Sequence, residues 1–296
     1  MRERWLVTGA LGCIGAWTCA TLVREGVAVT AFDLGDDLRR LRLIATPQEI
    51  DGIDFVRGDL TETGAVERVL AEREITHAVH LAALQIPLCR ENPVLGSKVN
   101  VTGTVEVFEA VKRHGLTTTL AYASSAAVYD ERGGIAPTTL YGVTKVANEG
   151  TARIYAQEHG IASVGLRPST VYGPGRDQGL TAGPTLAIAA AVRGEPYRIA
   201  FGGRTQLQYA GDVARAFVQA ARSGAGGAEV YNLGGDAAAI ADFTAHVRGS
   251  LPGADVTHEE STLPFPAELP RPWFDSPFTT LEEGIRATVE ILRSAW

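Results

Sequence analysis

Tyr141 and Lys145 form a Tyr-x-x-x-Lys pair. On an α-helix, residues i and i+4 share a face, so the lysine ammonium can stabilise the tyrosine phenolate and lower its pKa from about 10. A phenol tuned in this way can exchange a proton with a substrate hydroxyl near neutral pH. The same pair also occurs by chance on exposed helices, so its meaning depends on the elements around it.

A serine pair, Ser124 and Ser125, ends the strand that we predict for residues 117–125. Ligands of open α/β sheets bind at the carboxyl ends of the strands. A serine at that edge can hydrogen-bond the same substrate oxygen as the tyrosine. The two motifs together indicate a proton-transfer site.

Three glycines, Gly9, Gly12 and Gly15, span the junction between a predicted strand at 5–9 and a predicted helix at 14–25. Glycines at a strand–helix turn let the backbone approach a pyrophosphate, which then lies at the helix N-terminus. The spacing differs from the usual Gly-x-Gly-x-x-Gly pattern, so an ordinary turn is the alternative. Cys13, inside this loop, is interpreted as a small packing residue.

Asp33 ends the second predicted strand, at 27–33. A carboxylate there can accept hydrogen bonds from the hydroxyls of an adenosine ribose, which favours NAD over NADP. The alternative is that Asp33 only starts a turn. Arg39 and Arg40 could favour NADP, but on a presumed helix we expect them to be solvated. Asp59 and Leu60, after the third strand, are placed to meet the adenine.

Strand and helix patterns alternate over the first two-thirds of the chain, which is typical of βαβ units and a parallel sheet. We therefore predict an α/β fold, a Rossmann-type doubly wound parallel sheet with a smaller C-terminal substrate-binding lobe. After Pro168 the rhythm breaks, and residues 250–277 are rich in proline. The predicted NAD-binding domain comprises residues 1–170 with returns at about 203–235, and the lobe comprises 171–202 and 236–296.

Composition excludes several classes of protein. Lysine and arginine number 27 against 34 acidic residues, a net charge of −7, which argues against a nucleic-acid partner. No apolar run is long enough for a membrane span, so no membrane partner is expected. The three cysteines lack metal-ligand spacing, which predicts no metal site and a reducing, cytoplasmic setting.

These motifs in combination resemble the extended short-chain dehydrogenase/reductases of the NAD-dependent epimerase/dehydratase family. The resemblance covers roughly residues 5–215. It is carried by TGALGCIG at 8–15, GDL at 58–60, HLAA at 80–83, VNVTGT at 99–104, SSAAVY at 124–129, YGVTK at 141–145, RPSTVYGPG at 167–175 and GDVARAF at 211–217.

The resemblance implies a role for each matching residue. Tyr141 would be the catalytic acid/base, Lys145 its partner, Ser125 the catalytic serine, and Asn100 a further active-site residue. The implied NAD-binding residues are Gly9, Leu11, Gly12, Cys13, Ile14, Gly15, Asp33, Asp59, Leu60, Leu81, Ala82, Ala83, Asn100, Tyr141, Lys145, Pro168, Thr170 and Val171. Residues expected near the substrate are Gln85, Ser125, Ala126, Arg176 and Gln208.

Two departures bear on the substrate. Thr205 and Gln206 stand where nucleotide-sugar members carry an Arg-Asp pair whose arginine grips a diphosphate. A smaller substrate, such as a free sugar or a sugar acid, therefore suits the chain. Ala126 and Ala127 replace the acid/base pair that a dehydratase needs, which counts against that reaction type.

We thus expect an NAD-dependent oxidoreductase or epimerase that acts on a secondary hydroxyl of a small, sugar-like substrate. The alternatives are a dehydrogenase of a free sugar, uronate or aldonate that releases NADH, and a non-catalytic NAD-binding regulator. The resemblance also implies a homodimer through the helices of Asn100 and Tyr141. Apolar residues at helical spacing suit either this interface or the core of one chain; they are Val101, Val105, Phe108, Val146 and Ile154.

Overall fold

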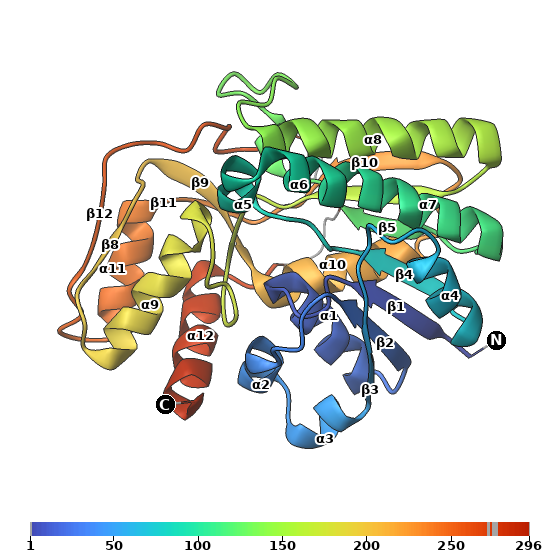
Figure 1. Ribbon diagram of the computed structural model, residues 1–296. Coiled ribbons are helices and arrows are strands. Elements are labelled where there is room, and N and C mark those ends of the chain that lie inside the picture. The colour runs from blue at the N-terminus through green and yellow to red at the C-terminus, as the bar shows by residue number, and fades with distance from the viewer. Residues whose placement is uncertain (1, 271–272, 274–277, 296) are drawn as a thin grey trace.

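A computed structural model describes residues 2–270, 273 and 278–295 of the 296-residue chain. Its centre is a seven-stranded parallel sheet in the order β10-β6-β5-β4-β1-β2-β3 (Figure 1). The strands are β1 (Arg4–Thr8), β2 (Ala28–Asp33), β3 (Ile53–Arg57), β4 (His77–His80), β5 (Leu120–Ala123), β6 (Ser163–Arg167) and β10 (Ala228–Asn232). The direction of chain progression reverses between β1 and β4, and the crevice at such a switch point is where ligands bind. The expected doubly wound sheet is confirmed.

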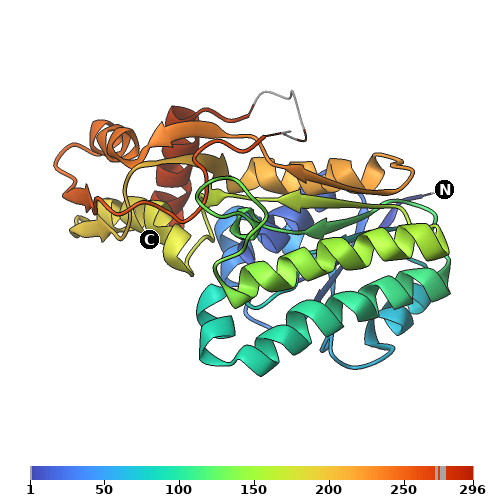
Figure 2. The ribbon, with the colours of Figure 1, turned by 90° about the horizontal axis from the view of Figure 1, so that it is seen from above.

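Helices cover both faces of this sheet, as Figure 2 shows from above. Successive side chains of a strand point to opposite faces, so Trp5 and Val7 lie in one core and Leu6 in the other. One face packs against α1 (Cys13–Arg24) and α10 (Ala210–Arg222). The other packs against α4 (Ala65–Glu72), α7 (Gly103–His114) and α8 (Leu140–His159).

The helix that carries Tyr141 is fixed at its start by a side-chain cap. The Thr139 hydroxyl accepts a hydrogen bond from the Gly142 amide at 3.1 Å, which satisfies one backbone donor of the first turn. Thr61 does not cap α4 (Ala65–Glu72), whose N-cap is Gly64. That helix begins at Ala65, because the Asp59 carboxylate accepts from the Thr61 amide and holds this segment in a turn.

The helical segment between β4 and β5 that ends at His114 is not one continuous α-helix. A π-helical turn, Lys98–Thr102, separates α6 (Pro93–Ser97) from α7. This turn contains Asn100. Three further short helices were not predicted: α2 (Arg39–Ile44), α3 (Pro47–Asp51) and α5 (Ile86–Glu91).

The remaining elements gather beside the carboxyl edge of the main sheet (Figure 1, left). A three-stranded sheet consists of β11 (Asp236–Ala239), β9 (Arg204–Tyr209) and β7 (Thr170–Tyr172), and a two-stranded one of β12 (Val256–His258) and β8 (Tyr197–Ile199). The helices are α9 (Gly183–Arg193), α11 (Ile240–Ser250) and α12 (Leu281–Ala295).

Within the described residues, the chain returns from this lobe to the main sheet through α10 and β10. β10 pairs in parallel with β6, whereas β9, within the same expected return at about 203–235, pairs with β7 and β11. Part of the proline-rich stretch, including Pro272 and Pro277, lies outside the described residues. No helix in the described part of the chain is long and apolar enough to span a membrane.

Candidate active site

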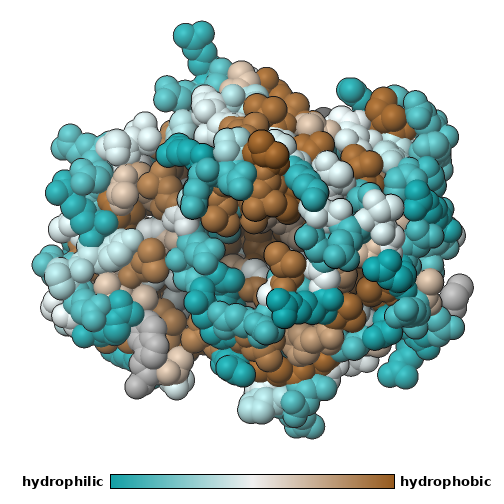
Figure 3. Space-filling view, viewed as in Figure 1, coloured by the Kyte–Doolittle hydropathy of each residue, from teal (hydrophilic) through white to brown (hydrophobic). Residues whose placement is uncertain are grey.

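A cavity of about 980 Å³ opens at the carboxyl ends of the central strands, between the main sheet and the lobe. Figure 3, in the same orientation as Figure 1, shows a hollow in the middle of the molecular surface with apolar side chains around it. The glycine loop lies at one end, and Ser125 and Tyr141 lie at the other.

The loop after β1 is packed so closely that two of its glycines admit no side chain. Gly9 has a φ of +68°, and a Cβ on it would lie 2.6 Å from the Ala82 backbone. A Cβ on Gly15 would lie 2.1 Å from the Gly9 carbonyl oxygen. The first intrahelical bond of α1 joins the Ala16 amide to the Gly12 carbonyl at 2.9 Å, so the preceding amides of the helix are free for an anionic group.

Asp33 lies at the end of β2, directly beside this loop. One carboxylate oxygen accepts from the Leu11 amide at 2.9 Å and the other from the Gly35 amide at 3.2 Å. Asp59 and Leu60 line the same end of the cavity. Backbone amides for a diphosphate, a carboxylate for a ribose diol and apolar walls for two rings are the features that a dinucleotide requires.

The expectation that Arg40 is solvated is wrong. Its side chain is only 16% exposed and pairs with Asp177 at 2.6 Å. A second guanidinium nitrogen donates to the Leu11 carbonyl at 2.9 Å. Arg40 therefore ties the segment after β7 to the glycine loop, and its charge is already matched by a carboxylate. Arg39, by contrast, is mostly exposed.

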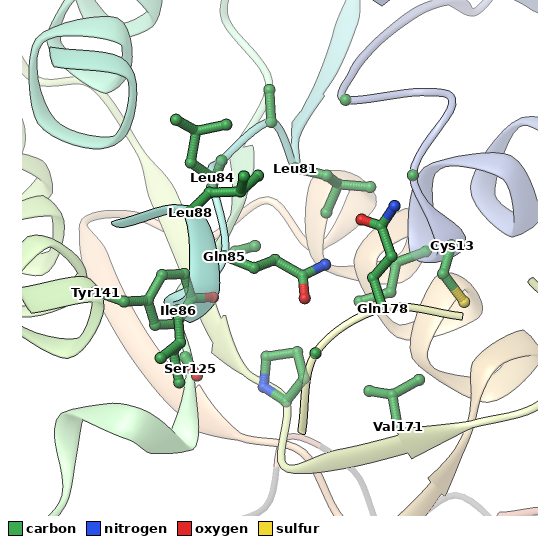
Figure 4. A pocket seen from close by; sticks show the side chains of 18 of the residues that line it. Cys13, Leu81, Leu84, Gln85, Ile86, Leu88, Ser125, Tyr141, Val171 and Gln178 are labelled. Atoms are coloured by element: carbon green, nitrogen blue, oxygen red, sulfur yellow. The ribbon is translucent and has the colours of Figure 1, made fainter. Parts of the chain in front are cut away.

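Tyr141 and Ser125 lie together on the wall opposite the glycine loop (Figure 4). Ser125 accepts from the Ala127 amide at 3.1 Å, which fixes the chain where it leaves β5. The Lys145 ammonium is buried, donates to the Ala123 carbonyl at 2.7 Å, and lies 5.4 Å from the centre of the Tyr141 ring.

The expected lowering of the Tyr141 pKa is not what the chain alone produces. Burial raises the pKa of this phenol, while the Ser125 hydroxyl and the Arg176 guanidinium act in the opposite direction. Burial also lowers the pKa of Lys145 to about 8. The physical reason is that desolvation disfavours the charged form of both groups.

Asn100 lies behind this wall and does not line the cavity. It is fully buried. Its side-chain oxygen accepts a hydrogen bond from the Leu84 backbone amide at 2.7 Å, and its side-chain nitrogen donates to the Leu84 carbonyl at 2.9 Å. Its backbone carbonyl accepts from Thr104 and Asn148. Asn100 thus fixes the segment after β4 that carries Gln85.

The other predicted residues divide into two groups. Most line the cavity: Leu11, Gly12, Cys13, Ile14, Leu81, Ala82, Ala83, Gln85, Ala126, Pro168, Val171 and Arg176. Thr170 and Gln208 do not. The Thr170 hydroxyl forms a hydrogen bond with the Thr205 hydroxyl at 2.8 Å. The side chain of Gln208 is buried; its oxygen accepts from the Ser169 backbone amide, and its nitrogen donates to the Leu233 carbonyl.

Much of the apolar lining of the cavity has no recognisable motif in the sequence. Leu84 and α5 supply aliphatic side chains above Gln85 (Figure 4). Leu263 and Phe265, from the proline-rich stretch, form part of another wall. The apolar residues of TLPFP at 262–266 could have signalled a packed segment.

Comparisons with known proteins agree with this arrangement. The sequence profile of the NAD dependent epimerase/dehydratase family matches residues 5–234. UDP-glucose 4-epimerase of Mycolicibacterium smegmatis is 28% identical over 98% of this chain and 99% of its own length. UDP-glucuronate 4-epimerase 2 of Arabidopsis thaliana is 32% identical over 57% of this chain, but the match spans only 42% of that relative's length.

Solved structures share the whole architecture. UDP-glucose 4-epimerase of Thermus thermophilus, in complex with NAD, superposes with a TM-score of 0.80 at 28% identity, covering 99% of this chain and 100% of that one. A partial-consensus L-threonine 3-dehydrogenase gives a TM-score of 0.86 at 22% identity, with 99% and 100% covered, which shows a common fold. The family profile spans more than half of the chain, and the protein therefore belongs to the NAD-dependent epimerase/dehydratase family.

Proposed function

We propose that this protein is an NAD-dependent oxidoreductase or epimerase that acts on a secondary hydroxyl of a sugar or sugar-derived substrate. The observation that carries the proposal is the placement of Tyr141, Ser125 and Lys145 in the same cavity as the glycine loop. Family membership supports it.

NAD would occupy the cavity from Asp33 to Tyr141. Its diphosphate suits the free amides at the start of α1, and its adenosine ribose suits the Asp33 carboxylate. Arg40 is held by Asp177 and would not be free to accept a 2′-phosphate. NAD, when bound, supplies the acceptor for the hydride that leaves the carbinol carbon.

The chain's own residues would handle the proton. As the carbinol C–H bond breaks and the carbonyl forms, the Tyr141 oxygen takes the hydroxyl proton. The Ser125 hydroxyl orients the same substrate oxygen. Lys145, fixed by the Ala123 carbonyl, places a positive charge beside the phenolate. In the reverse direction Tyr141 returns the proton.

Two reaction types share these groups. The full-length similarity to a UDP-glucose 4-epimerase favours epimerisation. A specific observation favours the alternative, a dehydrogenase of a free sugar, uronate or aldonate that releases NADH. Thr205 and Gln206, which replace the diphosphate-binding pair of nucleotide-sugar members, are both buried in β9 away from the cavity lining.

One experiment tests the proposal and separates the two types. The protein is incubated with NAD and a panel of sugars, sugar acids and nucleotide sugars. Growth of NADH absorbance identifies a dehydrogenase, and an epimeric product without net NADH identifies an epimerase. Absence of both across the panel, with NAD binding verified, would contradict the proposal.

We also propose a homodimer through α7 and α8 in a reducing, cytoplasmic setting. Val143 and Ile154 on α8 are 49% and 41% exposed, which suits an interface between two copies of the chain. The three cysteines are free thiols, which suits the reducing setting. Phe108 would not take part, because it is fully buried in the chain's own core. Light scattering should give twice the chain mass, and Ile154→Glu should reduce it; a monomer at micromolar concentration would refute the dimer.

A further inference from the structure

Arg176 lies in the wall of the cavity without a matching carboxylate. One terminal nitrogen donates to the Gln85 side-chain oxygen at 3.2 Å and the other to the Thr181 hydroxyl at 2.9 Å. Its Nε is buried and has no hydrogen-bond partner. No ion pair joins Arg176 to an acidic group among residues 2–270, 273 and 278–295. Both of its partners are neutral, so its charge is not compensated.

The other cations that line the cavity are differently placed. Arg40 pairs with Asp177, and Lys145 is bound to the Ala123 carbonyl beside Tyr141. Arg90 also lines the cavity but is exposed on α5. In the described part of the chain, Arg176 is therefore the cavity-lining cation that combines partial burial with an unmatched charge.

Arg176 is also close to the reacting end of the cavity. Its positive charge lowers the pKa of the Tyr141 phenol. Its partner Gln85 reaches into the space between Tyr141 and Cys13 (Figure 4). The aliphatic side chains of Leu84 and Leu88 lie above this space. A low local polarity strengthens charge–charge interactions, so an unmatched guanidinium there favours an anionic ligand group.

We propose that Arg176, together with the Gln85 amide, binds a carboxylate of the substrate. The substrate is then a secondary alcohol that carries a carboxylate a few bonds from the carbinol carbon, as in a sugar acid or another small hydroxy acid. This inference rests on the function proposed above and narrows it. The remaining N–H groups of one guanidinium suit one planar carboxylate. Among the described residues, the other arginine of the lining without an ion pair, Arg90, is exposed on α5.

Matched substrates test this in the NAD-loaded protein. An aldonate should be oxidised with a higher kcat/KM than its neutral alditol. Arg176→Gln should raise the KM for the acid roughly 10- to 100-fold, the range for a lost hydrogen bond to a charged group, with little change for the alditol. Arg176→Lys should restore part of the preference, and Arg90→Gln should leave it unchanged.

A binding readout keeps the test independent of turnover. Calorimetry with tartrate and malonate, on protein with bound NAD, should show binding to wild type and Arg90→Gln but not to Arg176→Gln. Unchanged NAD affinity and melting temperature would establish that Arg176→Gln is folded. Equal tartrate affinity in wild type and Arg176→Gln, or preferred turnover of neutral alcohols, would overturn the carboxylate site while leaving the proposed function intact. Carboxylate binding that depends on Arg176, without oxidation or epimerisation of any alcohol, would instead contradict the proposed function.

Discussion

The Lys145 ammonium lies 5.4 Å from the centre of the Tyr141 ring, one turn away on α8. Its hydrogen bond to the Ala123 carbonyl ties this helix to the end of β5. Ser125 follows the same strand end, so one lysine fixes the relative positions of both hydroxyl groups. The arrangement predicts that Lys145 matters both as a charge and as a structural link.

Replacement of Lys145 by methionine should reduce turnover roughly 10²- to 10³-fold, the cost typical of losing one stabilising group for developing charge. The deficit should be largest below pH 8 and should shrink above it, because burial lowers the Lys145 pKa to about 8 and the wild-type amine is neutral at higher pH. Turnover against pH for both proteins measures this. Lys98→Met, at an exposed position, is the control, and a deficit independent of pH would contradict a role for the charge.

The Tyr141 phenol should titrate above its ordinary value of about 10 in the protein without cofactor, because burial raises its pKa. Subtraction of the tyrosinate absorbance of Tyr141→Phe from that of wild type isolates this group. Ser125→Ala should move the titration still higher, since the Ser125 hydrogen bond lowers the pKa. A difference titration below the ordinary tyrosine value would show that desolvation does not dominate this site.

Asp33→Asn should lower the preference for NAD over NADP by roughly tenfold or more, the scale of a hydrogen bond to a charged group. The asparagine oxygen can still accept from the Leu11 amide, so the glycine loop should keep its shape. Dissociation constants of both cofactors give the ratio. Asp36→Asn, at an exposed position nearby, is the matched control. An unchanged ratio of NAD to NADP affinity in Asp33→Asn would contradict the role of the Asp33 carboxylate in binding the adenosine ribose.

His80 should make the fold sensitive to acid. It is buried between the hydroxyls of Thr8 and Thr104, at 2.7 and 3.1 Å, and burial lowers its pKa to about 3. Between that value and the unfolded value of about 6.5, only the unfolded chain binds the proton, so stability falls as pH falls.

From about pH 7 to about pH 5 this loss amounts to about 2 kcal/mol of unfolding free energy. Denaturant titrations at these two pH values should show this loss of unfolding free energy in wild type. The loss should be correspondingly smaller in His80→Asn. His246→Asn, at an exposed position on α11, should behave like wild type. The same pH dependence in His80→Asn would assign the sensitivity to other groups.

The parts of the site that the sequence predicts are those built by short stretches of chain. Helical spacing places Tyr141 and Lys145 on one face, and a strand followed at once by a helix places the glycine loop. Asp33 and Ser125 follow from their positions at strand ends. In each case a neighbouring residue and a known periodicity determine the geometry.

The parts that the sequence does not predict depend on contacts across the chain. Arg40 and Asp177 are 137 residues apart, and Arg176 and Gln85 are 91 apart. No local pattern pairs such charges, so Arg40 was expected to be solvated. Asn100 was expected near the active site, but the π-helical turn that directs its amide to Leu84 has no clear signature in sequence.

The proposed function requires that Tyr141 takes the hydroxyl proton as NAD oxidises a secondary alcohol. The most direct measurement mixes NAD-loaded wild type and Tyr141→Phe with the same sugar acids, sugars and nucleotide sugars, and follows enzyme-bound and free NADH absorbance in a single turnover. Wild type should form NADH with at least one alcohol, and Tyr141→Phe should bind NAD as tightly yet react roughly 10²- to 10⁴-fold more slowly, the range for a general acid–base group. Equal rates of NADH formation in the two proteins would place the proton acceptor elsewhere and contradict the proposed role of Tyr141.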